Sequence, residues 1–441
     1  MIESGAFPGS IRVTAYDGSH ARLAATVSLT AAAAGFLFSF RSILAMVAAR
    51  WLNIGTEPGV AAGLAAELLL LAAIAFSAFG PAALPLRSIA RQAPVRWVVL
   101  FLAFSCCSLL WSATVSPSAS FLYWCAMAAD VAIVALLLRS RPVDNIASSL
   151  MRGFIASTCL LALIAWIMPG QEDLRLGDQD YFNTNQIGNL CALAIFMAQC
   201  LASRKEGKWR FVIAFLTITL LRSLSKATIV AFVVAEAFLL LYDRTLSRRK
   251  KAFILVAAVL LIVAFGGLIA AYVDVYTTTG NQAETLTGRT AIWAYTLNES
   301  LDKPWIGNGI DAMWKVFPPF GREQFEARHA ENELLQQFFA YGLAGVLLLV
   351  GLYGSSFRRI LRLPGGPSKA VLIGIMLYTI VRGFAEAEPF DLLLPLWMIT
   401  LVSSMVDTAR WDNAVFKGKD HVLTGDNFSR AVDRPAARES L

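Results

Sequence analysis

The stretch LLQQFFAYGLAGVLLLVGLY, from Leu334 to Tyr353, decides the fold class because no charged side chain interrupts it. A bilayer core is about 30 Å thick, and a helix needs about 20 predominantly apolar residues to cross it. The rest of the 441-residue chain has the same character, since it is 57% hydrophobic and only 16% charged. A soluble protein of this length is not expected to be so apolar. We therefore predict an integral membrane protein.

Similar apolar stretches recur along the chain and predict about twelve transmembrane helices. The alternating pattern of a β-barrel is absent, so we expect helices, which satisfy their own backbone hydrogen bonds in lipid. The fold class is therefore all-α, a polytopic integral membrane protein. The predicted spans are Ala24–Val47, Gly59–Phe79, Trp97–Trp111, Ala119–Leu138, Phe154–Met168, Gln186–Leu201, Phe211–Leu221, Ala227–Tyr242, Ala252–Tyr272, Leu334–Tyr353, Ala370–Ile380 and Leu392–Val406.

Basic residues are concentrated in every second connector between these spans, for example at Arg139 and Arg141 and again from Arg248 to Lys251. The positive-inside rule places such connectors in the cytoplasm, and in a bacterium the opposite connectors then face the periplasm. The net charge of +7 follows from this topology, and no nucleic-acid partner is needed. We expect a cytoplasmic N-terminal segment (1–23), a membrane domain (24–406) in the inner membrane, and a disordered cytoplasmic tail (407–441).

One long polar segment, Val273 to Glu331, lies between two of the spans on the predicted periplasmic side. Trp293, Leu297 and Leu301 recur at helical spacing within it and predict a helix, which Pro304 ends. The segment is therefore expected to be an ordered lid on the membrane surface.

Further along this loop, Gly307 and Gly309 predict a tight turn, and a second short helix is expected near Arg322. Trp305 and Trp314 are expected at headgroup depth, where tryptophan is enriched.

Basic residues fall on the predicted periplasmic side, where positive charge is disfavoured, and six of them are candidates for one ligand site. The planar guanidinium of arginine suits phosphate oxygens, so their convergence indicates a phosphate or diphosphate ligand at headgroup height. Some of them could instead extend to the interface or form salt bridges. The six are Arg175, Arg222, Lys226, Arg289, Arg328 and Arg382.

Acidic residues near these cations, among them Glu331, offer a general base. Asp178-Gln179-Asp180 forms a bare DxD pattern, which by itself is weak evidence for a metal, and none of the six cysteines has a metal-ligand spacing. We expect neither a metal nor a cofactor. Walker, Rossmann, HExxH and GxSxG patterns are absent, so an ATP-driven or hydrolase function has no support.

Several of these motifs together resemble the O-antigen ligase and polysaccharide polymerase family, whose members are WaaL-like and Wzy-like. The large loop matches at TGRTAIW (Thr287–Trp293) and PWIGNG (Pro304–Gly309), followed by Trp314. Other matching positions are Asn332, Leu335, Gly342 and Gly345 at the next span, Arg175, Asn185 and Gly188 in an earlier loop, and Ser223–Lys226 in a short serine-rich loop.

The resemblance implies a GT-C-like membrane fold and a glycosyltransferase reaction at the periplasmic face. The donor would be an undecaprenyl-diphosphate-linked oligosaccharide, transferred to a sugar hydroxyl without a nucleotide sugar. It also implies a flippase and a chain-length copolymerase as partners, with membrane lipid around the protein. By this resemblance Arg289 contacts the diphosphate or glycan with Arg175 and Lys226. The remaining predicted binding residues are Asn185, Asn332, Arg222 and Arg328.

The sequence departs from the family at one position, because the ligases have histidine directly before the asparagine and this chain has Glu331. Glu331 could be the base, His329 could reach the site from the loop end, or Glu331 could only orient an arginine. The predicted catalytic residues are therefore Glu331, His329 and Arg289. Since the serine-rich loop and the loop motifs are closer to ExoQ-like exopolysaccharide polymerases, we favour a polymerase over a ligase that acts on lipid A-core.

A lipid-linked glycan transporter is the alternative of another class. Transporters carry charges in mid-span near broken helices. Here Asp130 and Glu236 are taken as the exceptions in otherwise uncharged spans, and Glu236 is predicted to pair with a neighbouring helix.

Overall fold

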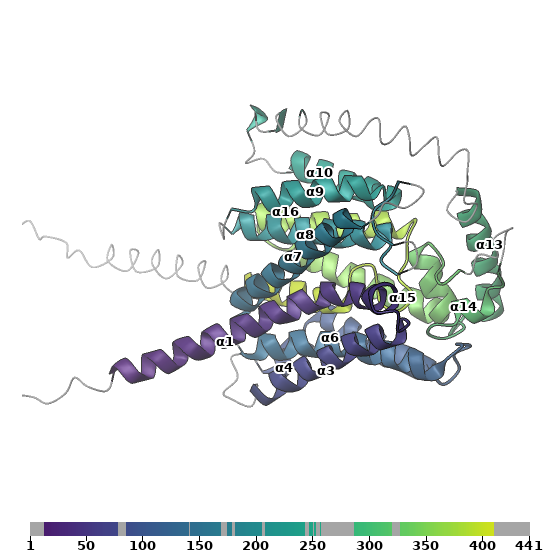
Figure 1. Ribbon diagram of the computed structural model, residues 1–441, viewed down its shortest axis with the longest axis horizontal. Coiled ribbons are helices and arrows are strands. Elements are labelled where there is room, and N and C mark those ends of the chain that lie inside the picture. Colours follow the sequence, from purple (N-terminus) through teal and green to yellow (C-terminus); the bar gives the residue numbers. More distant parts are fainter. Residues whose placement is uncertain are drawn as a thin grey trace, which may run out of the picture.

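The computed structural model describes residues 13–77, 85–140, 142–168, 174–178, 181–204, 208–242, 247–249, 251–252, 256, 286–319 and 327–409. Helices make up the regular structure of these ranges, and no strand occurs in them, which confirms the all-α prediction. Most helices run side by side along the long axis, while α13 crosses one end of the bundle (Figure 1). We call this the α13 end.

The helices follow the apolar stretches of the sequence. Their bounds are α1 Val13–Phe40, η1 Arg41–Ile43, α2 Leu44–Met46, η2 Val47–Trp51, α3 Glu57–Ser77, α4 Leu86–Ala90, α5 Ala93–Ser108, α6 Pro117–Ser140, α7 Val143–Ile167, α8 Thr184–Ser203, α9 Arg210–Ser223, α10 Lys226–Tyr242, α13 Leu286–Asp302, α14 Met313–Val316, α15 Glu333–Leu361 and α16 Pro367–Gly383. A last apolar helix covers Leu396–Ala409.

Every predicted span except one overlaps a helix of the described part; of the exception, Ala252–Tyr272, only Ala252 and Val256 are described, and the rest lies outside the described residues. Six helices of the described part are long and apolar enough to cross a membrane. The chain is therefore a multi-pass membrane protein, and the count of twelve stays a prediction. Several boundaries move outward, most of all at the starts of α1, at Val13 rather than Ala24, and of α7, at Val143 rather than Phe154. The start of α7 was not predicted because its first turns are polar. Asp144 in the first turn pairs with Arg204 at the end of α8, at 2.7 Å.

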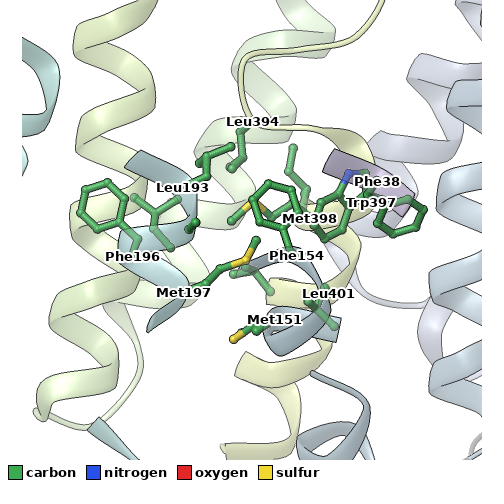
Figure 2. Packing of buried hydrophobic residues seen from close by; sticks show 14 of the residues in the cluster. Phe38, Met151, Phe154, Leu193, Phe196, Met197, Leu394, Trp397, Met398 and Leu401 are labelled. Atoms are coloured by element: carbon green, nitrogen blue, oxygen red, sulfur yellow. The ribbon is translucent and has the colours of Figure 1, made fainter. Parts of the chain in front are cut away.

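The bundle centre is packed with large apolar side chains from helices distant in sequence. Trp397 lies between Phe38 of α1 and Phe154 of α7, at ring-centroid distances of 4.7 and 6.0 Å (Figure 2). Helices α1 and α7 approach closely because both carry glycine at the crossing. A Cβ at Gly35 would lie 1.9 Å from the Leu150 carbonyl oxygen. Small residues at such crossings are how membrane helices gain packing contacts.

A buried ion cluster corrects the expectation that the spans are almost free of charge. Arg41 lies at the point where the first span changes from α- to 3₁₀-helix, and it binds both Glu67 of α3 and Asp130 of α6. The two carboxylates are 0% and 1% exposed. We call Arg41, Glu67 and Asp130 the mid-span triplet. The prediction for Glu236 is confirmed, since Gln199 of α8 donates a hydrogen bond to it at 2.6 Å.

The PWIGNG motif inserts into a break in α15 and fixes the large loop to the bundle. Gly342 interrupts the helix with φ of 62°, and a Cβ there would lie 2.4 Å from the Trp305 carbonyl carbon. The freed backbone groups pair with the loop, since Leu343 N–H donates to the Pro304 carbonyl at 2.7 Å and Asn308 N–H to Phe339 at 2.9 Å. A side chain at position 342 would block this approach, which explains the need for glycine there.

Candidate active site

Arg289 belongs to α13, which crosses the end of the bundle beside α14 (Figure 1). The loop has a small apolar core of its own, in which Ile292 packs with Met313, Phe317, Ala330 and Phe339. The helix ends before Pro304, as predicted, and Gly307 and Gly309 have positive φ as a tight turn requires. The predicted helix near Arg322 lies outside the described residues.

The predicted apolar face of α13 is not the face that packs on the protein. Leu297 and Leu301 are exposed, whereas Ile292, Thr296 and Ser300 are buried. Small hydroxyl residues let α13 approach the rest of the loop, and Ser300 satisfies its hydroxyl on the Thr296 carbonyl at 2.6 Å. Periodicity found the helix correctly but did not indicate which side faces inward.

The start of α15 brings the predicted catalytic residues towards α13. Asn332 caps the helix by accepting a hydrogen bond from Leu335 N–H at 3.0 Å, and its amide donates to the Phe384 carbonyl at 3.1 Å. Glu331, one residue earlier, has φ of 51°, a left-handed conformation that costs a non-glycine residue energy. Trp293 Nε1 of α13 donates to the Glu331 carbonyl at 3.2 Å. These contacts fix Glu331 between the loop and the bundle.

Arg289, His329 and Glu331 lie together with a fourth residue, Glu386, and we call these four the loop cluster. Arg289 Nη2 lies 3.4 Å from a carboxylate oxygen of Glu331 and 3.4 Å from one of Glu386. His329 Nδ1 lies 3.7 Å from the other Glu331 oxygen. Within the described residues the buried Arg289 Nε has no hydrogen-bond partner. One cation is therefore shared by two carboxylates and still has a donor to offer.

Burial sets the protonation of this cluster. The pKa of Glu386 is raised to about 7, first by burial and then by the nearby charge of Glu331. The pKa of His329 is lowered, mainly because its surroundings disfavour the charged imidazolium. At neutral pH His329 is therefore neutral, and Glu386 is poised between its two forms. The cluster can both hold an anion and exchange a proton.

The other predicted binding residues gather where α8 begins and α9 turns into α10. Arg175 is buried in the segment before α8, and Arg222 donates a hydrogen bond to the Leu174 carbonyl next to it. Asn185 accepts a hydrogen bond from Ser225 at 2.7 Å, and Lys226 follows as the first residue of α10. The structure thus brings Arg175, Asn185, Arg222 and Lys226 into one neighbourhood.

Helix α16 connects this neighbourhood to the loop cluster. Asn189, one turn after Asn185 on α8, accepts a hydrogen bond from Tyr378 of α16 at 2.9 Å. One turn further, the buried Arg382 lies 4.0 Å from Glu386 and 3.7 Å from Glu388. Arg382 was one of the six cations found in the sequence on the predicted outer side, but neither it nor Glu386 was among the predicted catalytic or binding residues. Their signal was weak because only the folded bundle places this loop beside Arg289.

Arg328 and Asp178 of the DxD pattern form their contacts with residues outside the loop cluster. Arg328 is exposed and lies over the Trp314 ring, 5.0 Å from its centroid. Asp178 of the DxD pattern pairs with Arg50 at 2.9 Å, while Asp180 lies outside the described residues. Among the residues that the structure describes, no group of three or more His, Cys, Asp or Glu side chains could hold a metal ion.

Comparisons with known proteins agree with the motifs. A family model described as O-antigen ligase matches residues 211–350, which include the large loop and the start of α15. The exopolysaccharide production protein ExoQ of Rhizobium meliloti (strain 1021) is 25% identical over 326 residues, which cover 68% of this chain and 73% of ExoQ.

Proposed function

We propose that this chain is a WaaL/Wzy-like protein of the ExoQ-like kind and that it polymerises saccharide repeat units. The family match and the similarity to ExoQ support this proposal. The glycan moves from a polyprenyl-diphosphate carrier to a hydroxyl of the next lipid-linked repeat. The reaction takes place at the periplasmic face of the inner membrane. A flippase supplies the lipid-linked repeats there, and a chain-length copolymerase sets the length of the product.

The reaction needs one base and one stabilised leaving group. The acceptor hydroxyl oxygen attacks the anomeric carbon of the donor and forms the new glycosidic bond. The bond from that carbon to the diphosphate oxygen breaks, and the lipid diphosphate leaves with the bonding electrons. The hydroxyl proton passes to a carboxylate of the site. No nucleotide or metal enters this balance.

Arg289 supports the second of these needs, the stabilised leaving group. Charge-assisted hydrogen bonds to carboxylates are usually about 2.7–2.9 Å long, and both of its contacts are 3.4 Å. Its guanidinium is therefore only loosely engaged by Glu331 and Glu386, and Nε remains available among the described residues. Charge develops on the diphosphate as it leaves, and a preorganised cation at that place stabilises the transition state.

Glu331 is the base that the geometry favours. Its backbone is fixed by Trp293, and its carboxylate lies between Arg289 and His329. His329 is neutral near pH 7 because burial lowers its pKa, so it can receive a proton from Glu331 or from a hydroxyl directly. In the alternative assignment His329 is the base and Glu331 orients Arg289. The two assignments are distinguished by whether Glu331→Gln or His329→Gln loses more activity.

The polymerase is favoured over the ligase by ExoQ and by Glu331 at the position where the ligases have histidine. The observation that carries the proposal is the convergence of Arg289, His329, Glu331 and Glu386 within the region that the family model matches.

The glycan profile of a deletion strain tests it. Loss of polymer with intact single repeats on the carrier supports a polymerase, whereas polymer that accumulates on the carrier identifies a ligase. Complementation with Arg289→Ala should fail, and Lys303→Ala, which removes an exposed positive charge from the same loop, should restore the wild-type profile.

A further inference from the structure

A basic groove lies at the end of α15 that is opposite to the α13 end. It has a volume of about 530 Å³ and is formed between α5 and α15. Trp97 of α5 lines one side, and Gly354, Ser355, Arg358, Arg359 and Arg362 line the other. Since a helix rises about 1.5 Å per residue, these arginines are roughly 40 Å along the chain axis from Glu333 at the start of α15. The groove is thus separate from the loop cluster.

Two glycines shape the groove in different ways. A Cβ at Gly351 would lie 2.6 Å from the Trp97 ring, so α5 and α15 touch there and close the floor. A Cβ at Gly354, one turn nearer the arginines, would meet nothing within 4 Å. The space above Gly354 is therefore open, and it is bounded by positive charge.

The face of α15 that leads to the groove changes from apolar to basic. Leu343, Leu347 and Val350 follow one another at helical spacing and are 41%, 66% and 59% exposed. Gly354 continues this face after four residues, and Arg358 and Arg362 follow at the same interval. A ligand that covers the whole face must have an apolar part along the span and an anionic part at its end.

The arginines of the groove are not equivalent. Arg359 pairs with Asp407 of the last helix, so its charge already has a partner. Within the described ranges, no carboxylate forms an ion pair with Arg358 or Arg362. These two guanidiniums supply the charge and the planar donors that a phosphate group requires.

We propose that this groove binds the phosphate headgroup of an anionic phospholipid, whose acyl chains lie along Leu343, Leu347 and Val350. Basic pockets between transmembrane helices bind such headgroups where the pocket lies at the level of the membrane surface. The site is independent of the proposed glycan transfer, since it lies at the other end of α15 and shares no residue with the loop cluster.

Native mass spectrometry of the purified full-length protein in detergent tests the proposal. With equal amounts of phosphatidylglycerol and phosphatidylcholine, the wild type should retain phosphatidylglycerol selectively. The double variant Arg358→Ala/Arg362→Ala should bind phosphatidylglycerol with an affinity lowered by about tenfold. Each arginine near a membrane surface contributes on the order of a few-fold in affinity. Arg87→Ala/Arg139→Ala, which removes two basic residues outside the groove, should keep wild-type binding. Equal loss in both double variants would show diffuse charge and overturn the site.

A second variant blocks the space without removing charge. Gly354→Trp fills the groove, and Gly365→Trp places the same side chain at another position where a Cβ meets open space. Phosphatidylglycerol binding should be lost in the first and kept in the second. Binding that survives Gly354→Trp, or a wild type without preference for phosphatidylglycerol, would contradict the proposal. Displacement of the lipid by inorganic phosphate alone, at millimolar concentration, would also contradict the proposal, because the apolar face would then contribute nothing to binding.

Discussion

The mid-span triplet and the loop cluster are built from the same residue types, one arginine shared by two carboxylates, yet they differ in how tightly they close. In the triplet Arg41 reaches Asp130 at 2.7 Å and also binds Glu67, and both carboxylates are essentially unexposed. In the loop cluster Arg289 lies 3.4 Å from each carboxylate, and Glu331 and His329 are 17% and 27% exposed.

This difference separates an ion cluster that holds helices together from one that can bind a ligand. The triplet joins the first span to α3 and α6, and its arginine is engaged on both sides by carboxylates. The loop cluster joins a loop helix to two bundle segments, and among the described residues Arg289 Nε has no hydrogen-bond partner. We therefore expect substitutions in the triplet to act on stability and substitutions in the loop cluster to act on turnover.

Arg41→Ala should have the largest effect on folding. Removal of one partner from a buried ion cluster costs about 3–5 kcal/mol, because the remaining charges are left uncompensated. Thermal unfolding in detergent and membrane abundance measure the loss. Arg96→Ala, an exposed arginine on α5, is the control and should behave as wild type. An Arg41→Ala protein with wild-type unfolding would show that the triplet does not hold the spans together.

Arg289→Ala should leave unfolding nearly unchanged and reduce kcat by about 10²–10³, the effect of removing one preorganised donor from a developing oxyanion. The measurement is polymer formed per unit of enzyme from lipid-linked repeats, with unfolding followed in the same preparation. If this variant unfolds like Arg41→Ala instead, the two clusters are both structural and the contrast between them fails.

Glu331→Gln should lower kcat by about 100-fold with little change in donor KM, at the lower end of the range for a general base. The loss stays at the lower end because His329 lies 3.7 Å away and can accept the proton less directly. His329→Gln should have a smaller effect. The reverse order of the two variants would assign the base to His329 and leave Glu331 to orient Arg289.

The smallest effect concerns pH. The pKa of Glu386 is raised to about 7, so this carboxyl is mostly protonated at pH 6 and mostly ionised at pH 8. When ionised it competes with the donor diphosphate for Arg289. Donor KM should therefore rise a few-fold between pH 6 and 8, and Glu386→Gln should make it nearly constant. A wild-type KM that falls with pH would reverse the role given to Glu386.

The sequence predicted the helical membrane fold because apolar length alone determines where a helix can enter a bilayer. It also placed Arg289 and Glu331 in one loop, and the structure brings them together. Glu386 was not assigned to the site, because Arg289 lies 97 residues earlier in the chain and only the packing of the bundle brings the two together. Arg41 and Glu67 were overlooked for a similar reason: each lies in an apolar stretch, and their pairing depends on how three helices pack.

The insertion of PWIGNG into the break of α15 also could not be predicted from the sequence. Glycine at 307 and 309 indicated a turn, and Gly342 in a span gave no sign that the helix is interrupted there. The backbone hydrogen bonds that join the two segments become visible only when both are seen at once. They explain why the loop can hold Arg289 at a fixed place over the bundle.

The most direct test of the central claim uses purified protein and polyprenyl-diphosphate-linked repeat units, with the products resolved by length and by what they remain attached to. We expect a ladder of polymer that stays on the lipid carrier with wild-type protein and with Lys303→Ala, and single repeats only with Arg289→Ala. A wild-type protein that makes no ladder but joins the glycan to lipid A-core would contradict it, as would a full ladder from Arg289→Ala.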